Sequence, residues 1–257
     1  MNATTPIVPA PAATSEPVSS AAPNPTAARQ DEIQAWFDET YTTRGLSYLR
    51  PEEAYEVFPT LLEARPGEHL LDIACGPGQL LKVAVTKGLV ATGIDLSPAA
   101  IALCQKRVPT AEATVANAEA LPFADNTFDL VTCLGSLERM LDRPRVLGEV
   151  KRVLRPGGRA CFLVRNADHP LWRFTRSLRL QNRRGHQDAA EQQNWTTLFR
   201  DAGFTVRDLY PDQWPMMRGR WQLRRFGVPA RFDRPKHGFG PVSWAYEFIF
   251  LLSHAED

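Results

Sequence analysis

The residues with the clearest chemical potential lie in a glycine-containing turn that follows an apolar run. The window HLLDIACGPGQLL (69–81) carries this run into Gly76-Pro77-Gly78, and a helical pattern follows. Glycines let the backbone approach a ligand closely, and the N-terminus of the next helix offers N–H groups without partners. The turn therefore predicts a ligand site, with a tight turn that binds nothing as the alternative.

The kind of ligand follows from the residues around the glycines. Asp72 lies inside the apolar run, four residues before Gly76. A dinucleotide fingerprint requires a third glycine where Leu81 stands, and the Gly-Lys-Ser/Thr of a P-loop is missing. We therefore expect a ligand with a cationic amine and a carboxylate rather than a pyrophosphate.

A second acid ends the next apolar run. In TGIDLSP (92–98), Asp95 lies 23 residues after Asp72, the length of one βαβ unit. A carboxylate at a strand end can accept hydrogen bonds from both hydroxyls of a ribose. Ser97 and Pro98 predict the N-cap and first turn of a helix. Because Asp95 precedes that cap, the sequence favours a nucleoside at this position.

These residues need a scaffold in which strands alternate with helices. Seven apolar runs have strand character: 69–74, 89–94, 113–116, 128–134, 159–164, 204–209 and 244–252. Segments of helical character separate the first six: 79–86, 98–107, a stretch near Glu119, 144–154 and 194–202. The alternation predicts an α/β fold with a doubly wound, mostly parallel sheet that is covered on both faces.

One domain is expected at 29–257, preceded by a disordered tail. Residues 1–28 are rich in Pro, Ala, Ser and Thr, lack the basic region of a signal peptide and cannot bury enough apolar surface to become ordered. Residues 29–64 are expected to form a helical cap and 65–166 the ligand-binding core. Two amphipathic helices are predicted in the cap: 30–43 and 51–63.

Composition limits the partners. The 30 basic and 29 acidic residues nearly cancel, so the overall charge gives no indication of a nucleic-acid partner. No apolar run is long enough to span a membrane. The cysteines contain no CxxC pair, so we expect small core residues in a cytoplasmic protein without a metal site. These cysteines are Cys75, Cys104, Cys133 and Cys161.

Five motifs in order resemble those of class I S-adenosylmethionine (SAM)-dependent methyltransferases, in particular the UbiE/type-11 small-molecule group. They are LDIACGPGQLL, TGIDLSP, NAEALPFADNTFDLV, LGSLERMLD and EVKRVLRPGGR, within about 65–165. The resemblance implies a Rossmann-like sheet of seven strands, the last antiparallel. It also implies SAM as cofactor, S-adenosylhomocysteine (SAH) as product, and a small molecule or biosynthetic intermediate as methyl acceptor.

The resemblance also implies roles for single positions. Gly76 and Gly78, next to Ala74, would pass under the methionine end of SAM, and Asp72 would lie beneath its amino group. Asp95 would hold the ribose. The remaining positions would surround the adenine and the sulfonium: Leu96, Asn117, Ala118 and Glu119 at the adenine, Leu134 and Gly135 at the sulfonium.

The chain departs from the family pattern at two positions. Asn117 stands where relatives usually have Asp, and its amide still forms hydrogen bonds. Where this chain has Glu138-Arg139, relatives often have Glu-His. That histidine is sometimes an acid, a base or a metal partner. A general base must therefore come from elsewhere: we favour His186, in the non-periodic loop RRGHQ, with Glu138 as the carboxylate alternative. His169 and His237 are further candidates.

Two basic segments, 167–192 and 211–242, are predicted to form a lid over the acceptor together with the cap. The second carries seven basic and two acidic residues with interleaved aromatics. Arginine binds carboxylate and phosphate and stacks on rings, so an anionic or aromatic acceptor is expected; a lid packed by its own aromatics is the alternative. Candidate acceptor residues are Tyr41, Arg139, His169, Trp172, Trp214, Arg218 and Trp221.

Two other functions stay open. An RNA methyltransferase would use the arginines and aromatics for phosphates and base stacking. The balanced charge and the lack of a recognisable RNA-binding domain argue against it. A SAM-binding protein without catalysis would bind SAM and show no turnover. O-, N- and C-methylation, and the oligomeric state, are equally compatible with these motifs.

Overall fold

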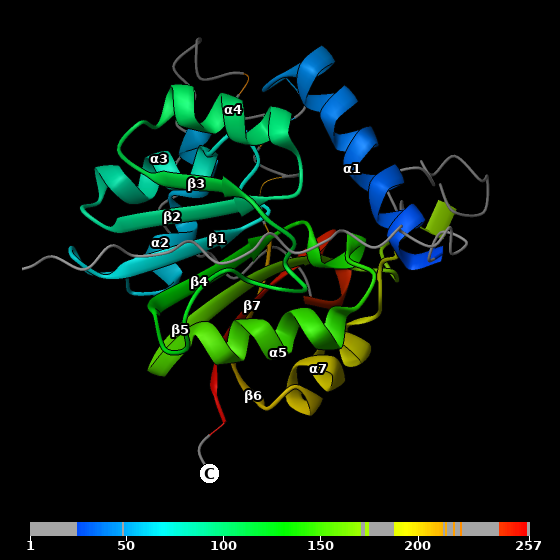
Figure 1. The fold of residues 1–257 in the computed structure, drawn as a ribbon. Coiled ribbons are helices and arrows are strands. Elements are labelled where there is room, and N and C mark those ends of the chain that lie inside the picture. The colour runs from blue at the N-terminus through cyan, green and yellow to red at the C-terminus, as the bar shows by residue number, and fades with distance from the viewer. Residues whose placement is uncertain are drawn as a thin grey trace, which may run out of the picture.

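A computed structural model describes residues 25–47, 49–170, 173–174, 188–212, 214, 218, 222 and 242–255. A central seven-stranded sheet runs through the molecule in the order β3-β2-β1-β4-β5-β7-β6 (Figure 1). The strands are β1 (His69–Ile73), β2 (Val90–Asp95), β3 (Glu112–Val115), β4 (Phe128–Leu134), β5 (Leu154–Arg165), β6 (Phe204–Pro211) and β7 (Glu247–His254).

The sheet is parallel except at β7. Parallel pairing joins β1 to both β2 and β4, β2 to β3, and β4 to β5, whereas β7 runs antiparallel between β5 and β6. The predicted mostly parallel seven-stranded sheet with its last strand antiparallel is therefore confirmed. The strand order reverses between β1 and β4, so the carboxyl ends of β1, β2 and β4 meet at one edge, where doubly wound sheets bind their ligands.

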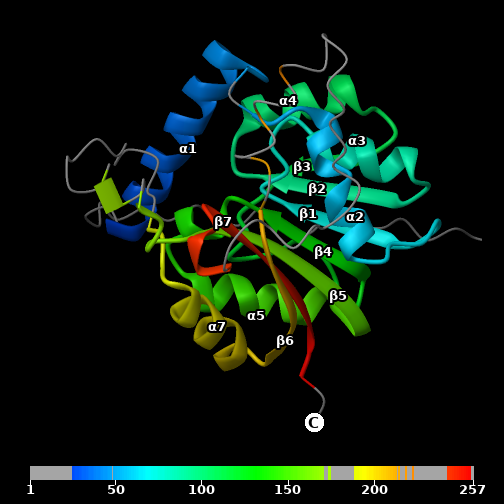
Figure 2. The same ribbon diagram turned by 180° about the vertical axis from the view of Figure 1, so that it is seen from behind.

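Helices cover both faces of the sheet. On one face α2 (Val57–Leu61), α3 (Gln79–Thr86) and α4 (Pro98–Arg107) bury one apolar cluster. On the other, α5 (Arg143–Val153) and α7 (Gln192–Asp201) bury a second. Figures 1 and 2 show these layers from opposite sides. The predicted helices at 79–86 and 98–107 agree with α3 and α4 at both ends.

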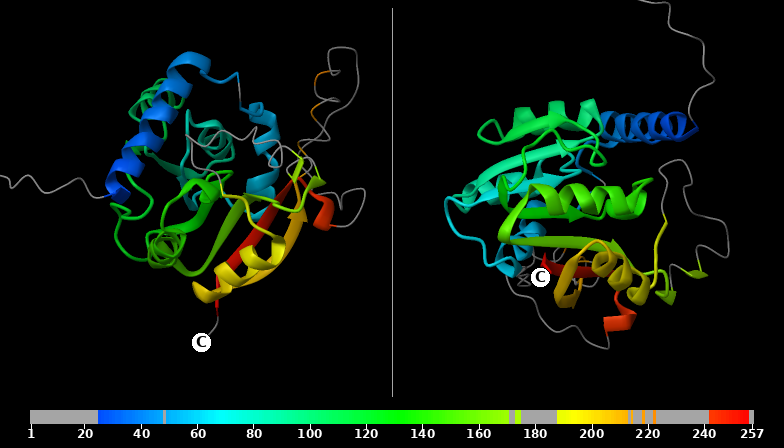
Figure 3. Two further views of the ribbon diagram at one scale, coloured as in Figure 1. Left: turned by 90° about the vertical axis from the view of Figure 1, so that its right-hand side faces the viewer. Right: turned by 60° about the horizontal axis from the view of Figure 1, so that its bottom comes forward.

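The N-terminal cap differs in part from its prediction. Helix α1 (Pro25–Arg44) is longer than the predicted 30–43 and lies beside α4 (Figure 3). The single helix predicted at 51–63 is wrong: a 3-10 turn, η1 (Glu52–Tyr55), precedes α2. Pro59 has no N–H to donate to Tyr55, so one continuous helix cannot form, but it is tolerated in the first turn of α2.

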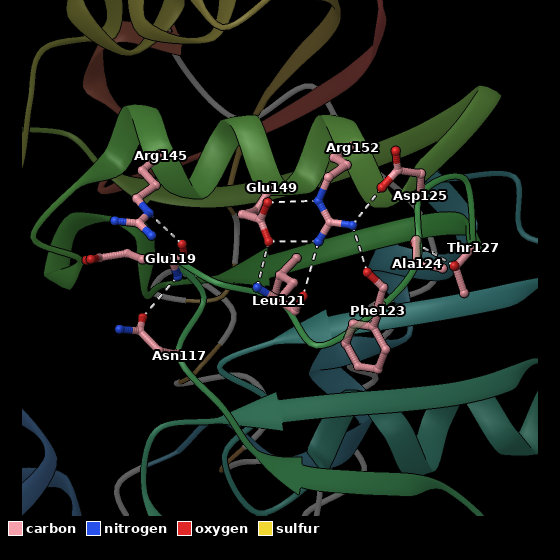
Figure 4. A network of polar contacts seen from close by, with 10 residues as sticks. All are labelled: Asn117, Glu119, Leu121, Phe123, Ala124, Asp125, Thr127, Arg145, Glu149 and Arg152. Atoms are coloured by element: carbon pink, nitrogen blue, oxygen red, sulfur yellow. Dashed lines mark hydrogen bonds and ion pairs between the residues drawn. The ribbon is translucent and has the colours of Figure 1, made fainter.

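The helix predicted near Glu119 is also wrong, because an irregular segment joins β3 to β4. Its backbone groups are paired with side chains of α5 (Figure 4). Arg145 Nε donates to the carbonyl of Glu119 (2.8 Å), and the N–H of Leu121 donates to Glu149 Oε2 (2.7 Å). Arg152 donates to the carbonyls of Leu121 (3.1 Å) and Phe123 (2.7 Å). These bonds replace those of a helix.

The start of the last strand was predicted too early, since residues 242–244 form a 3-10 turn, η4 (Val242–Trp244). All four cysteines are buried free thiols. No helix among the described residues combines the length and apolar character that a membrane span requires. Residues 1–24 and most of the predicted lid lie outside the described residues, and the domain limits stay a prediction.

Candidate functional site

A cavity opens at the carboxyl edge of the sheet, beneath α1. Its lining comes from α1, from the loops that follow β1, β2 and β3, and from the turn η2 (Leu137–Arg139) with its neighbours. The lining residues are Gln30, Ile33, Phe37, Tyr41, Ala74, Ile94, Asp95, Leu96, Ala116, Asn117, Ala118, Glu119, Ser136, Arg139 and Met140. Segments far apart in the chain thus meet in one concave site.

The glycine turn fits tightly against its surroundings. Gly78, with φ of 78°, precedes α3, and a Cβ at this position would lie 2.5 Å from Cys104 Sγ. Gly76 has φ of 54°, and a Cβ there would lie 2.7 Å from the hydroxyl of Tyr41. Left-handed backbone and close packing both require glycine at these positions. The turn is further held by Arg107, which donates to the carbonyl of Pro77.

Asp95 is bound to the glycine turn. Its Oδ2 accepts a hydrogen bond from the N–H of Gly76 (2.8 Å), and its Oδ1 accepts one from the N–H of Ser97 (2.9 Å). Burial raises the pKa of Asp95 to about 6, opposed by these N–H groups. Each carboxylate oxygen can accept a second bond, so Asp95 can shape the turn and still bind a hydroxyl.

Asp72 lies beneath the turn, within β1. It is 4% exposed, and burial raises its pKa to about 7, while the hydrogen bond from the Thr132 hydroxyl opposes this shift. Asp95 also contributes by charge repulsion. Two carboxylates with raised pKa values, at a ligand-binding edge, mark a candidate functional site.

Helix α1 is fixed over the cavity by polar and cation–π contacts. Asp38 accepts hydrogen bonds from the Ser97 hydroxyl and from the N–H of Ala99 (3.2 Å), so α1 joins the start of α4. The guanidinium of Arg139 lies 5.7 Å from the ring centroid of Trp36 and 5.4 Å from that of Phe37. These contacts hold the apolar side chains of α1 above the loops.

A buried charge cluster lies at the same edge of the sheet, where β5 ends and β7 begins. Arg50 donates to both carboxylate oxygens of Asp212 (3.2 and 3.0 Å) and to Glu247 (3.1 Å). Burial disfavours its charge, but the two carboxylates outweigh this effect and raise the pKa of Arg50. Arg165 Nε lies 3.4 Å from Glu247 and 3.8 Å from Glu138.

Most of the predicted cofactor positions come together in the structure. Five of these positions lie outside the cavity lining, at the strand ends and turns beside it: Asp72, Gly76, Gly78, Leu134 and Gly135. Two residues expected on the acceptor side, Tyr41 and Arg139, line the cavity as well. So do six residues expected around the cofactor: Ala74, Asp95, Leu96, Asn117, Ala118 and Glu119.

Of the other acceptor-side candidates, the three that the structure describes do not line the cavity. His169 packs edge-on against Tyr246 with ring centroids 5.2 Å apart, and burial lowers its pKa. Arg218 is exposed, and the backbone N–H of Trp214 donates to Asp212 (3.4 Å). Four candidates lie outside the described residues: Trp172, His186, Trp221 and His237.

Sequence reasoning missed two groups of residues. Ile33 and Phe37 line the cavity, and their spacing with Tyr41 along one helix face is the signal that could have found them. Arg50, Asp212 and Glu247 gave no such signal, because the pairs are 162 and 197 residues apart.

Comparisons with known proteins agree with this geometry. Residues 71–162 match the family described as "Methyltransferase domain". A demethylmenaquinone methyltransferase from Lactiplantibacillus plantarum is 34% identical over 166 residues, which cover 53% of this chain and 70% of that protein. The chain belongs to the class I SAM-dependent methyltransferases. SAM is the methyl donor that this family shares.

Other similarities set the extent of the match. The methyltransferase fold aligns with the structure of a possible histamine N-methyltransferase from Thermotoga maritima with a TM-score of 0.60 and 17% identity, over 86% of this chain and 97% of that one. A demethylmenaquinone methyltransferase from Symbiobacterium thermophilum is 36% identical over 49% of this methyltransferase chain. The match spans 53% of that relative's length, so the chain covers about half of it.

Proposed function

We propose that this chain transfers a methyl group from SAM to a small-molecule acceptor. The observation that carries the proposal is that Asp95, the 116–119 segment and Ala74 meet in one cavity beneath α1. An acid at the end of β2 beside a glycine turn suits a nucleoside joined to an amino acid. Demethylmenaquinone methyltransferases among the relatives support a small-molecule acceptor.

Within this proposal the cavity and the turns beside it would each hold one part of SAM. Asp95 accepts hydrogen bonds from the ribose hydroxyls, and Leu96 packs against the adenine, edged by Asn117, Ala118 and Glu119. The glycine turn at Gly76 and Gly78, beside the cavity, would hold the methionine end, and Asp72 would pair with its ammonium group. At the sulfonium, Leu134 and Gly135 provide backbone groups. Gly135 has φ of 71°, and a Cβ there would meet open space.

Bound SAM supplies a methyl group that its sulfonium already activates. The chain must align the acceptor with that methyl group and exclude water, and orientation of this kind supplies roughly 7–11 kcal/mol of a barrier. Helix α1 serves the second need, because Ile33, Phe37 and Tyr41 close the cavity from one side. Seven basic residues with interleaved aromatics in the segment 211–242 favour an anionic or aromatic acceptor.

Calorimetry with SAH tests this proposal, because SAH binds without turnover. The wild type is expected to bind SAH with micromolar affinity, and Asp95→Asn to bind it at least tenfold more weakly. Glu112→Gln, an exposed substitution on β3, is the matched control and should bind like the wild type. Absence of SAH binding by the wild type would overturn the proposal.

Transfer itself is measured separately. Methyl-labelled SAM is incubated with the protein and a pool of small phenols, amines and carboxylates, and label in the organic phase is counted. A protein that binds SAH and transfers no label to any member of the pool would contradict catalysis and favour a SAM-binding role. If total RNA takes the place of the pool and becomes labelled, the RNA methyltransferase alternative is supported.

A further inference from the structure

A second cavity lies at the carboxyl edge of the sheet, beside the cavity beneath α1. Its volume is about 660 Å³, within the range of roughly 300–1,000 Å³ that small-molecule sites have. It is lined by the segment that follows β4, by Ala167 after β5, and by the N-terminal parts of α5 and α7. These two helices lie side by side on one face of the sheet (Figures 1 and 2).

Met140 connects the two cavities, because it lines both of them. It follows η2, directly after Arg139, which lines the cavity beneath α1. In the proposed function that cavity holds SAM, with the sulfonium near Leu134 and Gly135. A molecule in the second cavity that extends past Met140 therefore reaches the cavity of the methyl donor.

Arg143 holds the wall of the second cavity in place. Its guanidinium lies 5.1 Å from the ring centroid of Trp195, and it donates to the carbonyls of Asp188 (2.8 Å) and Glu138 (3.4 Å). An ion pair of 3.2 Å joins it to the Asp188 carboxylate. The indole N–H of Trp195 donates to the carbonyl of Arg165 at the end of β5 (2.9 Å). These contacts fix the shape of the cavity independently of a ligand, which lowers the entropy cost of binding.

The lining of the second cavity suits an aromatic ligand. Apolar side chains make up most of it, among them Met140, Leu141 and Leu198. Arg143 adds a guanidinium, a group that stacks on aromatic rings. Asn194 is exposed at the rim, where its amide can donate to and accept from a polar group.

Charge at the second cavity disfavours an anion. The lining contains one cation, Arg143, and two carboxylates, Asp188 and Glu191. The ion pair with Asp188 neutralises Arg143, whereas Glu191 forms no ion pair within the described part of the chain and no side-chain cap bond to α7. The charge that remains is negative, and it repels an anionic ligand.

We propose that the second cavity binds the uncharged aromatic body of the methyl acceptor, whose reacting end extends past Met140 to the methyl group of SAM. Arg143 and the apolar side chains contact the rings, and Glu191 selects against an acceptor with a negative charge. This inference rests on the proposed function, and it narrows an anionic or aromatic acceptor to an uncharged aromatic one.

Binding to SAH-loaded protein tests the inference with two probes that share one body. 4-Phenylphenol carries an uncharged hydroxyl on two aromatic rings, and biphenyl-4-carboxylate carries a carboxylate in its place. Calorimetry should give 4-phenylphenol a Kd at least tenfold lower than that of the carboxylate. Glu191→Gln should bind the carboxylate at least twofold more tightly than the wild type does. Asp201→Asn, an exposed change at the other end of α7, is the matched control and should not alter this Kd.

Filling the second cavity tests where the probe binds. Asn194 is exposed and lines the cavity, whereas its neighbour Gln193 is exposed and does not line it. Asn194→Trp should weaken the binding of 4-phenylphenol at least tenfold, and Gln193→Trp should bind it like the wild type. Both variants should keep the Tm of the wild type and a Kd for SAH within twofold, because both positions lie at the surface.

Contacts between the two bound ligands test the acceptor role. Nuclear Overhauser measurements on the ternary complex should show 4-phenylphenol close to the methylene protons beside the sulfur of SAH, and Asn194→Trp should lose this signal. Binding of the probe without such contacts would overturn the acceptor role of the cavity.

Three further results would overturn the inference: no binding of 4-phenylphenol, equal or tighter binding of the carboxylate by the wild type, or equal binding of 4-phenylphenol by Asn194→Trp and the wild type. Absence of SAH binding by the wild type would instead overturn the proposed function itself. SAH binding is therefore measured first, and the two failures stay distinguishable.

Discussion

The hydroxyl of Thr132 on β4 donates a hydrogen bond of 2.7 Å to Oδ1 of Asp72 on β1. The two residues are register partners in neighbouring parallel strands, and both are buried. Thr132 therefore fixes the rotamer of an acid that we propose to lie beneath the amino group of SAM. Because burial raises the pKa of Asp72 to about 7, its charge changes near neutral pH.

SAH affinity should rise with pH as Asp72 ionises. A carboxylate with a pKa of about 7 is mostly protonated at pH 6 and mostly ionised at pH 8, and only the ionised form attracts an ammonium group. We expect about a tenfold gain in SAH affinity between these pH values, measured by calorimetry. Asp72→Asn should bind weakly and lose this part of the dependence. A wild-type affinity that falls over the same range would contradict the assignment.

Thr132→Val should move that pH dependence upward. The substitution keeps the side-chain shape but removes the hydrogen bond that favours the ionised form of Asp72, so its pKa rises further. We expect weaker SAH binding at pH 7 and a smaller difference from the wild type at pH 9. Thr114→Val, at an exposed position of β3, should leave the profile unchanged. Coinciding profiles for Thr132→Val and the wild type would show that the hydrogen bond is unimportant.

Local patterns in the sequence predicted the sheet and the surroundings of Asp95. Gly76, Gly78 and Asp95 belong to short windows in which strand, turn and helix signals follow each other directly. A helix was predicted wrongly for the segment after Asn117, because its backbone is paired with the side chains of Glu149 and Arg152 from α5. A window of neighbouring residues contains no record of such pairing.

Two further features show the same limit. The break between η1 and α2 could have been predicted, since Pro59 removes one N–H from the helical ladder. The pairing of Arg50 with Asp212 could not, because it depends on how the cap folds back onto the far side of the sheet. Glu138 was singled out only through its motif. That its carboxylate oxygens find no hydrogen-bond donor among the described residues becomes visible only in three dimensions.

Gly78→Ala should destabilise the protein for two separable reasons. The new Cβ would lie 2.5 Å from Cys104 Sγ, and φ of 78° costs a residue with Cβ about 1–2 kcal/mol. Adding Cys104→Ala should relieve the contact and leave the backbone cost, as measured by urea unfolding. Gly148→Ala is the control: nothing lies within 4 Å, and a helix interior gains about 0.5–1 kcal/mol from Ala. Full recovery in the double variant would show that the backbone conformation costs nothing.

Arg50→Met should cost far more stability than loss of a surface arginine. The Arg50 side chain is 10% exposed, and its removal leaves Asp212 and Glu247 as buried carboxylates without their main donor, at a cost of about 3–5 kcal/mol. Arg29 pairs with Glu32 at 2.8 Å, but these side chains are 37% and 64% exposed, so Arg29→Ala should change the free energy of unfolding by about 0.2–1 kcal/mol.

The cost of Arg50→Met should arise from the carboxylates it leaves behind rather than from the lost pair itself. Adding Asp212→Asn and Glu247→Gln to Arg50→Met should therefore restore part of the stability in urea unfolding, because uncharged amides are cheaper to bury than unpaired carboxylates. If the triple variant unfolds as easily as Arg50→Met alone, the packing of the arginine side chain against Tyr55 and Phe58 is the dominant contribution, since its guanidinium lies 5.9 Å from each ring centroid.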